Sequence, residues 1–309
     1  MGKTAFIFPG QGAQCAGMGK DFFEQFSEAR QMFELAGTSV GLDIKSLCFE
    51  EDERLNITEY TQIAMITTEI AMLKAVLSRG LTADVCAGLS LGEYGALVAS
   101  GVMQPADCFR IVRRRGILMQ EAYPEGGAMT AVIGMDSEKI EKIEKICEET
   151  EGIVTIANYN CPGQIVITGI REAVEAAAEK LKNAGAKKCA PLKVSGPFHS
   201  ELLSDAGRQL REALDEIHLE KPKIPYVTNV DASYVQDETG VKDLLVRQIS
   251  SPVRWQQSVE CMIQNGVDRF IEIGPGKTLT GFMKRINSGV RAMNIATVED
   301  LDRVLDEIK

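Results

Sequence analysis

The pattern of apolar and polar positions switches along the chain between strand-like apolar runs and helical periodicity, so it predicts alternating strands and helices. An apolar run at Thr4–Phe8 is typical of a buried strand, and the glycine-rich turn Pro9–Gly12 follows it. Helical periodicity is predicted for Lys20–Leu35, Thr58–Ser78 and Pro105–Glu121. This alternation favours a largely parallel sheet covered by helices.

The rhythm changes in the segment 125–195, where the pattern predicts strand, helix, two strands, helix and strand. The predicted elements are Ala128–Ile133, Ser137–Glu149 with Ser137 as N-cap, Ile153–Ala157, Gln164–Thr168 after a loop at Asn158–Gly163, Arg171–Asn183 and Lys187–Leu192. The β-α-β-β-α-β order is that of a ferredoxin-like fold. We therefore expect a small subdomain at 125–195, inserted into a large one made of 1–124 and 196–309.

Further elements are predicted after position 195, where the large unit resumes. They are a helix after His199, strands at Tyr226–Thr228 and Arg269–Ile273, helices at Val241–Ile249 and Val253–Asn265, and a last helix from Glu299. The predicted class is α/β, with an α/β-hydrolase-like core built on a mostly parallel sheet and the small subdomain inserted into it.

Composition narrows the class of protein. The chain has 309 residues, 45% of them hydrophobic and 25% charged, as in ordinary globular proteins. No apolar run approaches the roughly 18 residues of a membrane span, and a net charge of −10 argues against a nucleic-acid partner. The eight cysteines form no C-x-x-C pair, so we expect neither a metal site nor disulfides, and a cytoplasmic location.

A serine between two glycines lies where a predicted strand, Ala83–Ala87, gives way to a predicted helix, Glu93–Ala99. Gly88-Leu89-Ser90-Leu91-Gly92 has the G-x-S-x-G pattern of a nucleophile elbow, whose tight turn presents the hydroxyl at the start of a helix. The next backbone amide can then stabilise an oxyanion. A chain with 28 glycines also produces this pattern by chance, but the flanking strand and helix favour the elbow.

Serine needs a neighbouring base to act as a nucleophile, and the chain has only two histidines. His218 ends a helical pattern, where a solvated structural role is expected. His199 lies in a loop with a glycine and a proline that opens into a helix, of the kind on which catalytic groups concentrate. We expect His199 to be the base; the alternative is a capping or core histidine. More than a hundred residues follow His199, so the usual order of a hydrolase fits only loosely.

Arg115 is predicted to point into the protein. Its neighbours three and four positions away along the predicted helix are all apolar, namely Ile111, Val112, Leu118 and Met119. A buried guanidinium requires an anion. That anion is either an internal Asp or Glu, or a carboxylate on the substrate that the guanidinium grips with two hydrogen bonds.

Two glycine-rich turns invite a functional interpretation. Gln11 directly follows the first strand and is placed to offer a second backbone amide to an oxyanion, although a plain turn explains the same residues equally well. Gly274–Thr278 lacks the spacing of a phosphate-binding P-loop, so we expect a structural turn there.

With these pieces in place, the chain closely resembles the malonyl-CoA:acyl carrier protein transacylase family of fatty acid synthesis, almost from end to end. The shared motifs are Phe8-Pro9-Gly10-Gln11-Gly12, Gly88 to Tyr94, Arg115-Gly116 with Met119-Gln120-Glu121-Ala122, Pro197-Phe198-His199, Arg247-Gln248 with Pro252-Val253, and Glu272-Ile273-Gly274-Pro275-Gly276-Lys277. Several separate motifs in the family's order are far more specific than any one of them.

The resemblance implies a role for each candidate residue. Ser90 is the acyl-enzyme nucleophile and His199 its base. The backbone amides of Gln11 and Leu91 form the oxyanion hole, and Arg115 binds the malonate carboxylate.

Three further positions also acquire roles from the resemblance, and one position departs from the family. The backbone carbonyl at Gln248 orients the histidine, Asn160 lies beside the substrate, and Phe198 is the residue typical of malonyl enzymes. The family usually has a histidine before the nucleophile, and here it is Leu89. That histidine is not the base, so transfer should survive the change, whereas any tuning of Ser90 by it is lost.

The function implied is transfer of a malonyl group from malonyl-CoA to the phosphopantetheine thiol of acyl carrier protein, through a malonyl-serine, with ping-pong kinetics. We expect a monomer that needs no cofactor. Two rival hypotheses are a serine thioesterase of acyl-CoA and a non-catalytic subunit that docks the carrier protein. Because the carrier protein is acidic, docking needs local positive charge, for which Lys187-Lys188, Arg254 and Lys284-Arg285 are the candidates.

Overall fold

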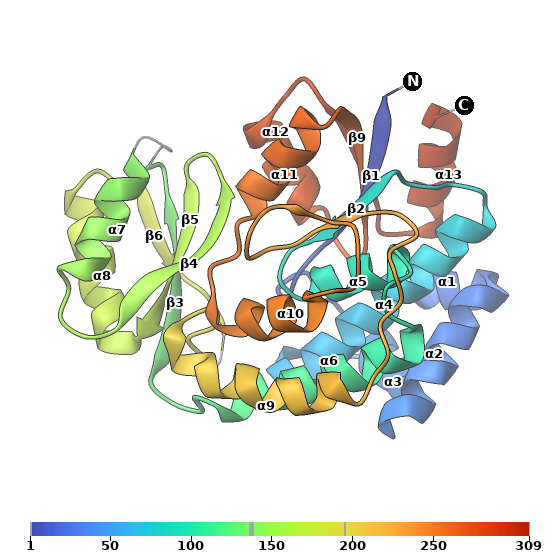
Figure 1. Cartoon of the computed structure of the whole chain (residues 1–309), viewed down its shortest axis with the longest axis horizontal. Coiled ribbons are helices and arrows are strands. Elements are labelled where there is room, and N and C mark those ends of the chain that lie inside the picture. Colours follow the sequence, from blue (N-terminus) through green and yellow to red (C-terminus); the bar gives the residue numbers. More distant parts are fainter. Residues whose placement is uncertain (1, 136–138, 195, 309) are drawn as a thin grey trace.

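The computed structural model describes residues 2–135, 139–194 and 196–308, which fold around two separate sheets (Figure 1). The larger sheet contains, in order across it, β10 (Arg291–Ile295), β9 (Val267–Ile273), β1 (Lys3–Phe8), β2 (Val85–Gly88), β7 (Tyr226–Val227) and β8 (Tyr234–Val235). Every neighbouring pair is parallel except β7 with β8. The predicted α/β class with a mostly parallel sheet is confirmed.

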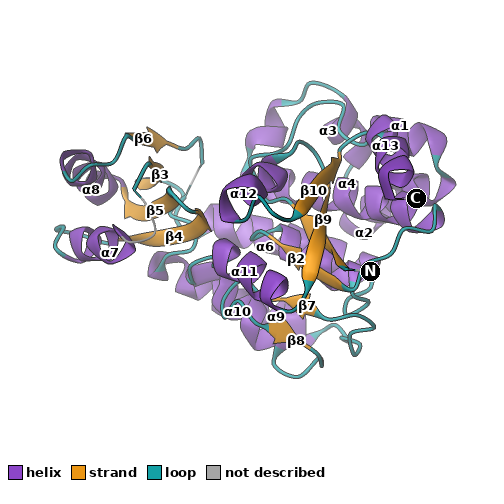
Figure 2. Cartoon of the chain, turned by 90° about the horizontal axis from the view of Figure 1, so that it is seen from above, coloured by secondary structure: helices purple, strands orange, loops and turns teal. Residues whose placement is uncertain are grey.

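Helices cover both faces of the large sheet, as the view from above shows (Figure 2). The helices packed around this sheet, directly or through another helix, are α1 (Lys20–Gln25), α2 (Ser27–Val40), α3 (Ile44–Phe49), α4 (Thr58–Ser78), α5 (Gly92–Ala99), α6 (Pro105–Glu121), α9 (Ser204–Asp215), α10 (Val241–Ser250), α11 (Trp255–Gln264), α12 (Thr278–Ile286) and α13 (Val298–Ile308). Strand β1 shows why both faces need cover. Phe6 and Phe8 pack into the cluster that contains α4 and α5, whereas Ala5 and Ile7 pack into the one that contains α11 and α12.

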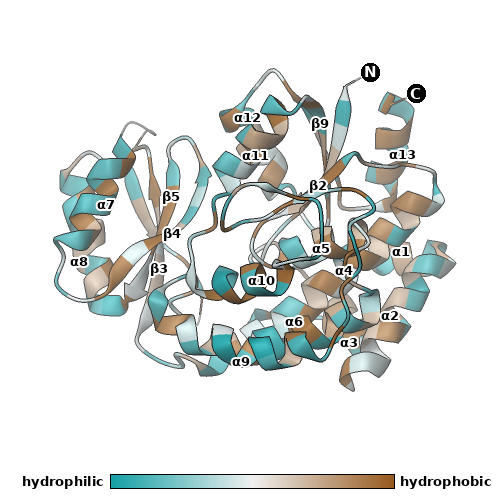
Figure 3. Ribbon diagram, viewed as in Figure 1, coloured by the Kyte–Doolittle hydropathy of each residue, from teal (hydrophilic) through white to brown (hydrophobic). Residues whose placement is uncertain are grey.

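The burial of each helix follows its hydrophobic pattern. Sixteen residues of α4 are buried, on every side of the helix, which is typical of a helix in the middle of a core. By contrast, α9 buries only Ala206, Gly207, Leu210 and Leu214 and is largely hydrophilic on its outer side (Figure 3). No helix among the described residues is long and apolar enough to cross a membrane.

The smaller sheet is antiparallel and has its own core. Its strands are, in order, β4 (Val154–Cys161), β5 (Gln164–Ile170), β3 (Gly127–Ile133) and β6 (Lys188–Pro191), and α7 (Ile140–Glu148) and α8 (Arg171–Asn183) cover one face (Figure 1). Strand and helix order is β-α-β-β-α-β, as expected of a ferredoxin-like unit. The boundaries 1–124, 125–195 and 196–309 stay a prediction, and the N-cap expected at Ser137 lies outside the described residues.

Several predicted elements differ from those observed. The helix predicted at Lys20–Leu35 is two helices, because Phe26 between them is extended. The loop predicted at Asn158–Gly163 was wrong as far as Cys161: β4 continues through it with two register shifts, and the backbone amide of Tyr159 donates to Val253 O at 2.9 Å. This long-range bond holds the segment extended against the start of α11. Elements α3, α12, β8 and β10 were not predicted.

Candidate active site

Ser90 lies in a tight turn between β2 and α5, in a backbone conformation that side chains rarely adopt. Its φ is 54°, in the left-handed region. A Cβ at Gly88 would lie 2.0 Å from Gly92 C, and a Cβ at Gly92 would lie 2.1 Å from Phe8 O, so both flanking positions must be glycine. The structure therefore has the strand–turn–helix geometry of a nucleophile elbow.

His199 faces Ser90 from the loop before α9. Its Nε2 is 2.8 Å from Ser90 Oγ, and its Nδ1 is 2.9 Å from the backbone oxygen of Gln248. Because a carbonyl oxygen can only accept, Nδ1 carries the proton and Nε2 is left to accept from the hydroxyl. Burial, followed by the positive charge of Arg115, lowers the pKa of His199 to about 4, so the imidazole is neutral at pH 7.

Arg115 is buried as predicted, with 1% of its surface exposed. Its guanidinium donates to Gln62 Oε1 at 2.7 Å, to Gln248 Oε1 at 3.1 Å and to Ser90 Oγ at 3.3 Å. None of the ion pairs formed among the described residues includes it. An internal ion pair, the alternative considered for this cation, is therefore not observed, and all three hydrogen-bond partners are neutral.

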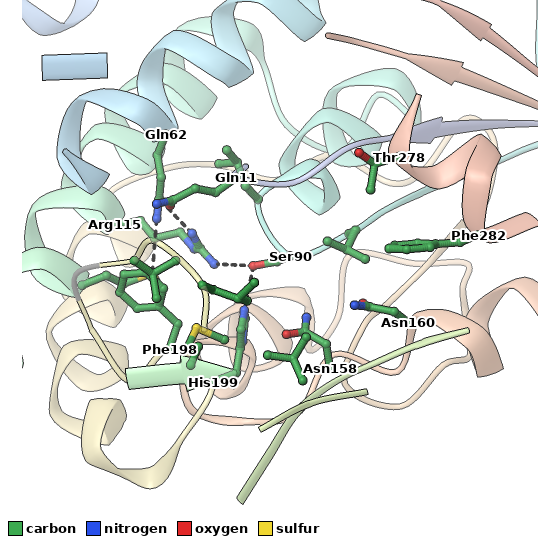
Figure 4. Close-up of a pocket in the computed structure, with 17 residues that line it drawn as sticks. Gln11, Gln62, Ser90, Arg115, Asn158, Asn160, Phe198, His199, Thr278 and Phe282 are labelled. Atoms are coloured by element: carbon green, nitrogen blue, oxygen red, sulfur yellow. Dashed lines mark hydrogen bonds between the residues drawn. The ribbon is translucent and has the colours of Figure 1, made fainter. Parts of the chain in front are cut away.

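These groups meet in a pocket that lies between the two sheets (Figure 4). Besides Ser90, Arg115 and His199, its lining residues are Gln11, Gln62, Leu89, Leu91, Met119, Met129, Asn158, Asn160, Val166, Leu192, Val194, Phe198, Thr278 and Phe282. The pocket thus has polar groups around Ser90 and apolar side chains beyond them, as ligand sites usually do.

The remaining candidates line the same pocket. Phe198 and Asn160 are both buried and line the pocket, and Asn160 Oδ1 has no hydrogen-bond partner within the described chain. Gln11 and Leu91 flank Ser90, and among the described residues neither of their backbone amides donates a hydrogen bond to another protein atom. Those two amides are therefore available to a ligand.

Two functional neighbours were not found from the sequence. Gln62, on α4, holds the guanidinium of Arg115. Asn229 accepts from the backbone amide of Ser90 at 2.6 Å and donates to Gly88 O at 2.6 Å, which fixes the elbow from the side of β7. A glutamine within a helix rich in apolar residues and an asparagine just after a strand were the available signals.

The other sites singled out have structural surroundings. His218 is exposed and lies 3.5 Å from Glu220, as expected of a solvated residue. Gly274 to Lys277 form the predicted turn, between β9 and α12, and Thr278 after it lines the pocket. Within the described chain, no group of three His, Cys, Asp or Glu side chains is placed to hold a metal ion.

Comparison with known proteins points in one direction. The acyl transferase domain family matches residues 5–301. A malonyl CoA-acyl carrier protein transacylase of Bacillus subtilis is 43% identical over 311 residues, covering 100% of this chain and 98% of the relative. The structure of such a transacylase from Clostridium perfringens superposes with a TM-score of 0.94 at 42% identity, covering 99% of this chain and 97% of that one. A malonyl-transacylase solved with a type II PKS acyl-carrier protein gives 0.94 at 40% identity, covering 99% of each chain.

Proposed function

This chain belongs to the acyl transferase domain family, among the malonyl CoA-acyl carrier protein transacylases. On that basis we propose that Ser90 carries the malonyl group from the thiol of coenzyme A to the phosphopantetheine thiol of acyl carrier protein. The enzyme is an acyl carrier protein S-malonyltransferase of fatty acid synthesis. One observation supports the roles of nucleophile, base and cation most directly. Ser90 Oγ lies 2.8 Å from His199 Nε2 and 3.3 Å from Arg115 Nη2.

In the first half-reaction, Ser90 Oγ attacks the thioester carbonyl of malonyl-CoA while its proton passes to His199 Nε2. The oxyanion accepts hydrogen bonds from the backbone amides of Gln11 and Leu91. When the C–S bond breaks, the proton moves from His199 to the leaving sulfur, and the malonyl-serine ester remains. His199 is suited to this exchange because its low pKa keeps Nε2 free to accept a proton at pH 7.

The distal carboxylate of the malonyl group pairs with Arg115. The guanidinium is buried and bonded only to neutral groups, so an arriving carboxylate adds the missing negative charge. An acetyl group has no such charge. Asn160 and Phe198 line the same pocket and complete the malonyl site.

In the second half-reaction, the phosphopantetheine thiol of acyl carrier protein gives its proton to His199 and attacks the ester carbonyl. The C–Oγ bond breaks, Ser90 recovers the proton, and the malonyl thioester leaves on the carrier. Ping-pong kinetics follow, because both thiols use one site in turn.

The carrier protein docks at the rim shared by α12 and the small sheet. Arg285, next to Lys284, donates to Gln164 Oε1 at 3.2 Å. Gln164 pairs across the small sheet with Ile133, and Ile133 pairs with Lys188, so these cations lie at the same end of that sheet.

Two further observations support this surface. Arg254 lies nearby: its guanidinium is 5.6 Å from the centre of the Tyr159 ring, and Tyr159 is on strand β4 of the same sheet. Phe282, one turn from Arg285 on α12, lines the pocket, which links the basic rim to the active site. On a chain with a net charge of −10, such a local group of cations is what an acidic partner needs.

The cysteines bear on the location of the enzyme, and the active site bears on its oligomeric state. All eight cysteines are free, which favours a reducing cytoplasm. One chain supplies the nucleophile, the base and the cation, so a monomer is sufficient for the reaction.

Incubation with malonyl-CoA and no acceptor tests the proposal. Intact-protein mass spectrometry should show one malonyl group added per chain, on the peptide that contains Ser90, and none on Ser90→Ala. Rapid steady release of free malonate without a stable adduct would support a thioesterase instead. Equal, negligible turnover by the wild type and Ser90→Ala would support a subunit that only docks the carrier.

A further inference from the structure

Glu93 is a buried carboxylate directly behind the nucleophile elbow that the reaction above does not use. It lies in the first turn of α5 and has no exposed surface. Its Oε2 accepts from Gln248 Nε2 at 2.6 Å and from the backbone amide of Asn229 at 3.1 Å. Its Oε1 has no hydrogen-bond partner within the described chain. A buried carboxylate is costly, so a compensating role is expected.

Gln248 connects this carboxylate to the active groups. The Nε2 that donates to Glu93 also donates to the backbone oxygen of Ser90 at 3.0 Å. Its Oε1 accepts from Arg115 at 3.1 Å, and its backbone oxygen holds His199 at 2.9 Å. One residue therefore touches the nucleophile's backbone, the base and the cation, and Glu93 is the anion to which its side chain is tied.

Building on the proposed function, we propose that Glu93 is a positioning residue for malonyl transfer, and that it acts through Gln248. His199 is oriented by the backbone carbonyl of Gln248, so the carboxylate of an ordinary triad is missing at that point. Here the carboxylate of Glu93 contacts Gln248, and Gln248 contacts His199. It anchors the amide whose oxygen supports Arg115, and it fixes the residue whose carbonyl orients His199.

This anchor tolerates protonation. Burial raises the pKa of Glu93 to about 7, opposed by Gln248, the backbone of Asn229 and the side chain of Thr228, which favour the carboxylate, and by the charge of Arg115. The other titratable groups that affect this region are the phenols of Tyr94, on the same helix, and Tyr226, on β7. A proton would settle on Oε1, which has no partner, and Oε2 would still accept both bonds. A neutral isostere should therefore keep most of the function.

The test compares Glu93→Met, which removes the acceptor, with Glu93→Gln, which keeps it, and with Glu69→Met as the matched control. Glu69 is a second fully buried carboxylate in the same unit, and its oxygens bond to no other described residue. The readouts are the single-turnover rate of malonyl-Ser90 formation, the preference for malonyl-CoA over acetyl-CoA, and the melting temperature.

Glu93→Met should lower both the acylation rate and the malonyl preference by about 10- to 100-fold, the range that a charge-assisted hydrogen bond is worth. Glu93→Gln should recover most of that loss, and Glu69→Met should change only the melting temperature. Wild-type rate and preference in a folded Glu93→Met protein would overturn the inference.

Gln248→Met provides the second arm of the test. It removes the bridging amide and keeps the backbone carbonyl that holds His199. Alone it should reproduce the loss of malonyl preference, and in its background Glu93→Met should cost nothing further. Additive losses, or unchanged preference in Gln248→Met, would contradict the coupling even if Glu93→Met cannot be purified. Failure of the wild type to form the Ser90 adduct would instead refute the proposed function.

Discussion

Replacing Arg115 by alanine removes the cation on which malonyl selectivity depends. The side chain is 1% exposed and its three hydrogen bonds all go to neutral oxygens, so no carboxylate contacts the guanidinium directly until the substrate carboxylate binds. Breaking a buried ion pair by removing one partner costs about 3–5 kcal/mol. At about 1.4 kcal/mol per tenfold, kcat/KM for malonyl-CoA should fall by about 10²- to 10⁴-fold.

Acetyl-CoA provides the internal reference, because it has no carboxylate to lose. Its kcat/KM should fall less, by at most about 10- to 100-fold, the worth of the one charge-assisted hydrogen bond between Arg115 and Ser90 Oγ. The preference for malonyl over acetyl should therefore collapse. Both substrates are measured in one competition assay, in which the malonyl and acetyl adducts are counted by mass spectrometry.

Arg113→Ala is the matched control on the same helix. Arg113 pairs with Glu59 at 2.7 Å and does not line the pocket, so its loss should lower the melting temperature and leave selectivity unchanged. If a folded Arg115→Ala protein keeps the wild-type preference, or if Arg113→Ala loses it, the assignment of the cation is refuted.

Three other predictions concern pH, stability and docking. Because the pKa of His199 is lowered to about 4, kcat/KM should stay level down to about pH 5 and fall below it as Nε2 is protonated; an acid limb near pH 6.5 would contradict this. Burial raises the pKa of Glu69 well above its ordinary 4.5, so folding favours the protonated form and stability is lost as pH rises above 4.5, by about 1.4 kcal/mol per unit up to the folded pKa. Glu69→Gln should therefore lose less stability than the wild type between pH 5 and 8 in thermal melts, and equal losses would refute the argument. Arg285→Glu should raise KM for acyl carrier protein but not KM for malonyl-CoA, whereas the exposed control Arg208→Glu should change neither constant. Added salt should weaken binding of the carrier protein to the wild type. Equal effects of the two variants, or binding that is indifferent to salt, would argue against this docking surface.

The sequence predicted best those parts of the fold that depend on local chemistry. The bounds of α4, α6 and α8 agree with the predicted Thr58–Ser78, Pro105–Glu121 and Arg171–Asn183. Helices α6 and α8 are amphipathic, whereas α4 is buried on every side and its end was predicted from the stop signal Arg79-Gly80. The elbow was predictable because its G-x-S-x-G pattern is local, although the constraint on Gly92 comes from Phe8 at the end of β1. The burial of Arg115 followed from its helical neighbours.

Long-range contacts explain what was missed. Gln62 reaches Arg115 across 53 positions and Asn229 reaches Ser90 across 139, and no local pattern encodes either pairing. The extension of β4 past Ala157 likewise depends on a bond to Val253. The choice of anion for Arg115 could not be made from the sequence for the same reason, since its neighbours come from α4 and α10.

The central claim is that Ser90 passes its acyl group to a thiol rather than to water. Purified malonyl-enzyme should be mixed with phosphopantetheinylated acyl carrier protein in one sample and with buffer in another, and the Ser90 ester followed by rapid quench and mass spectrometry. We expect rapid discharge with the malonyl group recovered on the carrier, and an ester that persists in buffer. Equal rates in both samples, with free malonate as the product, would contradict the account.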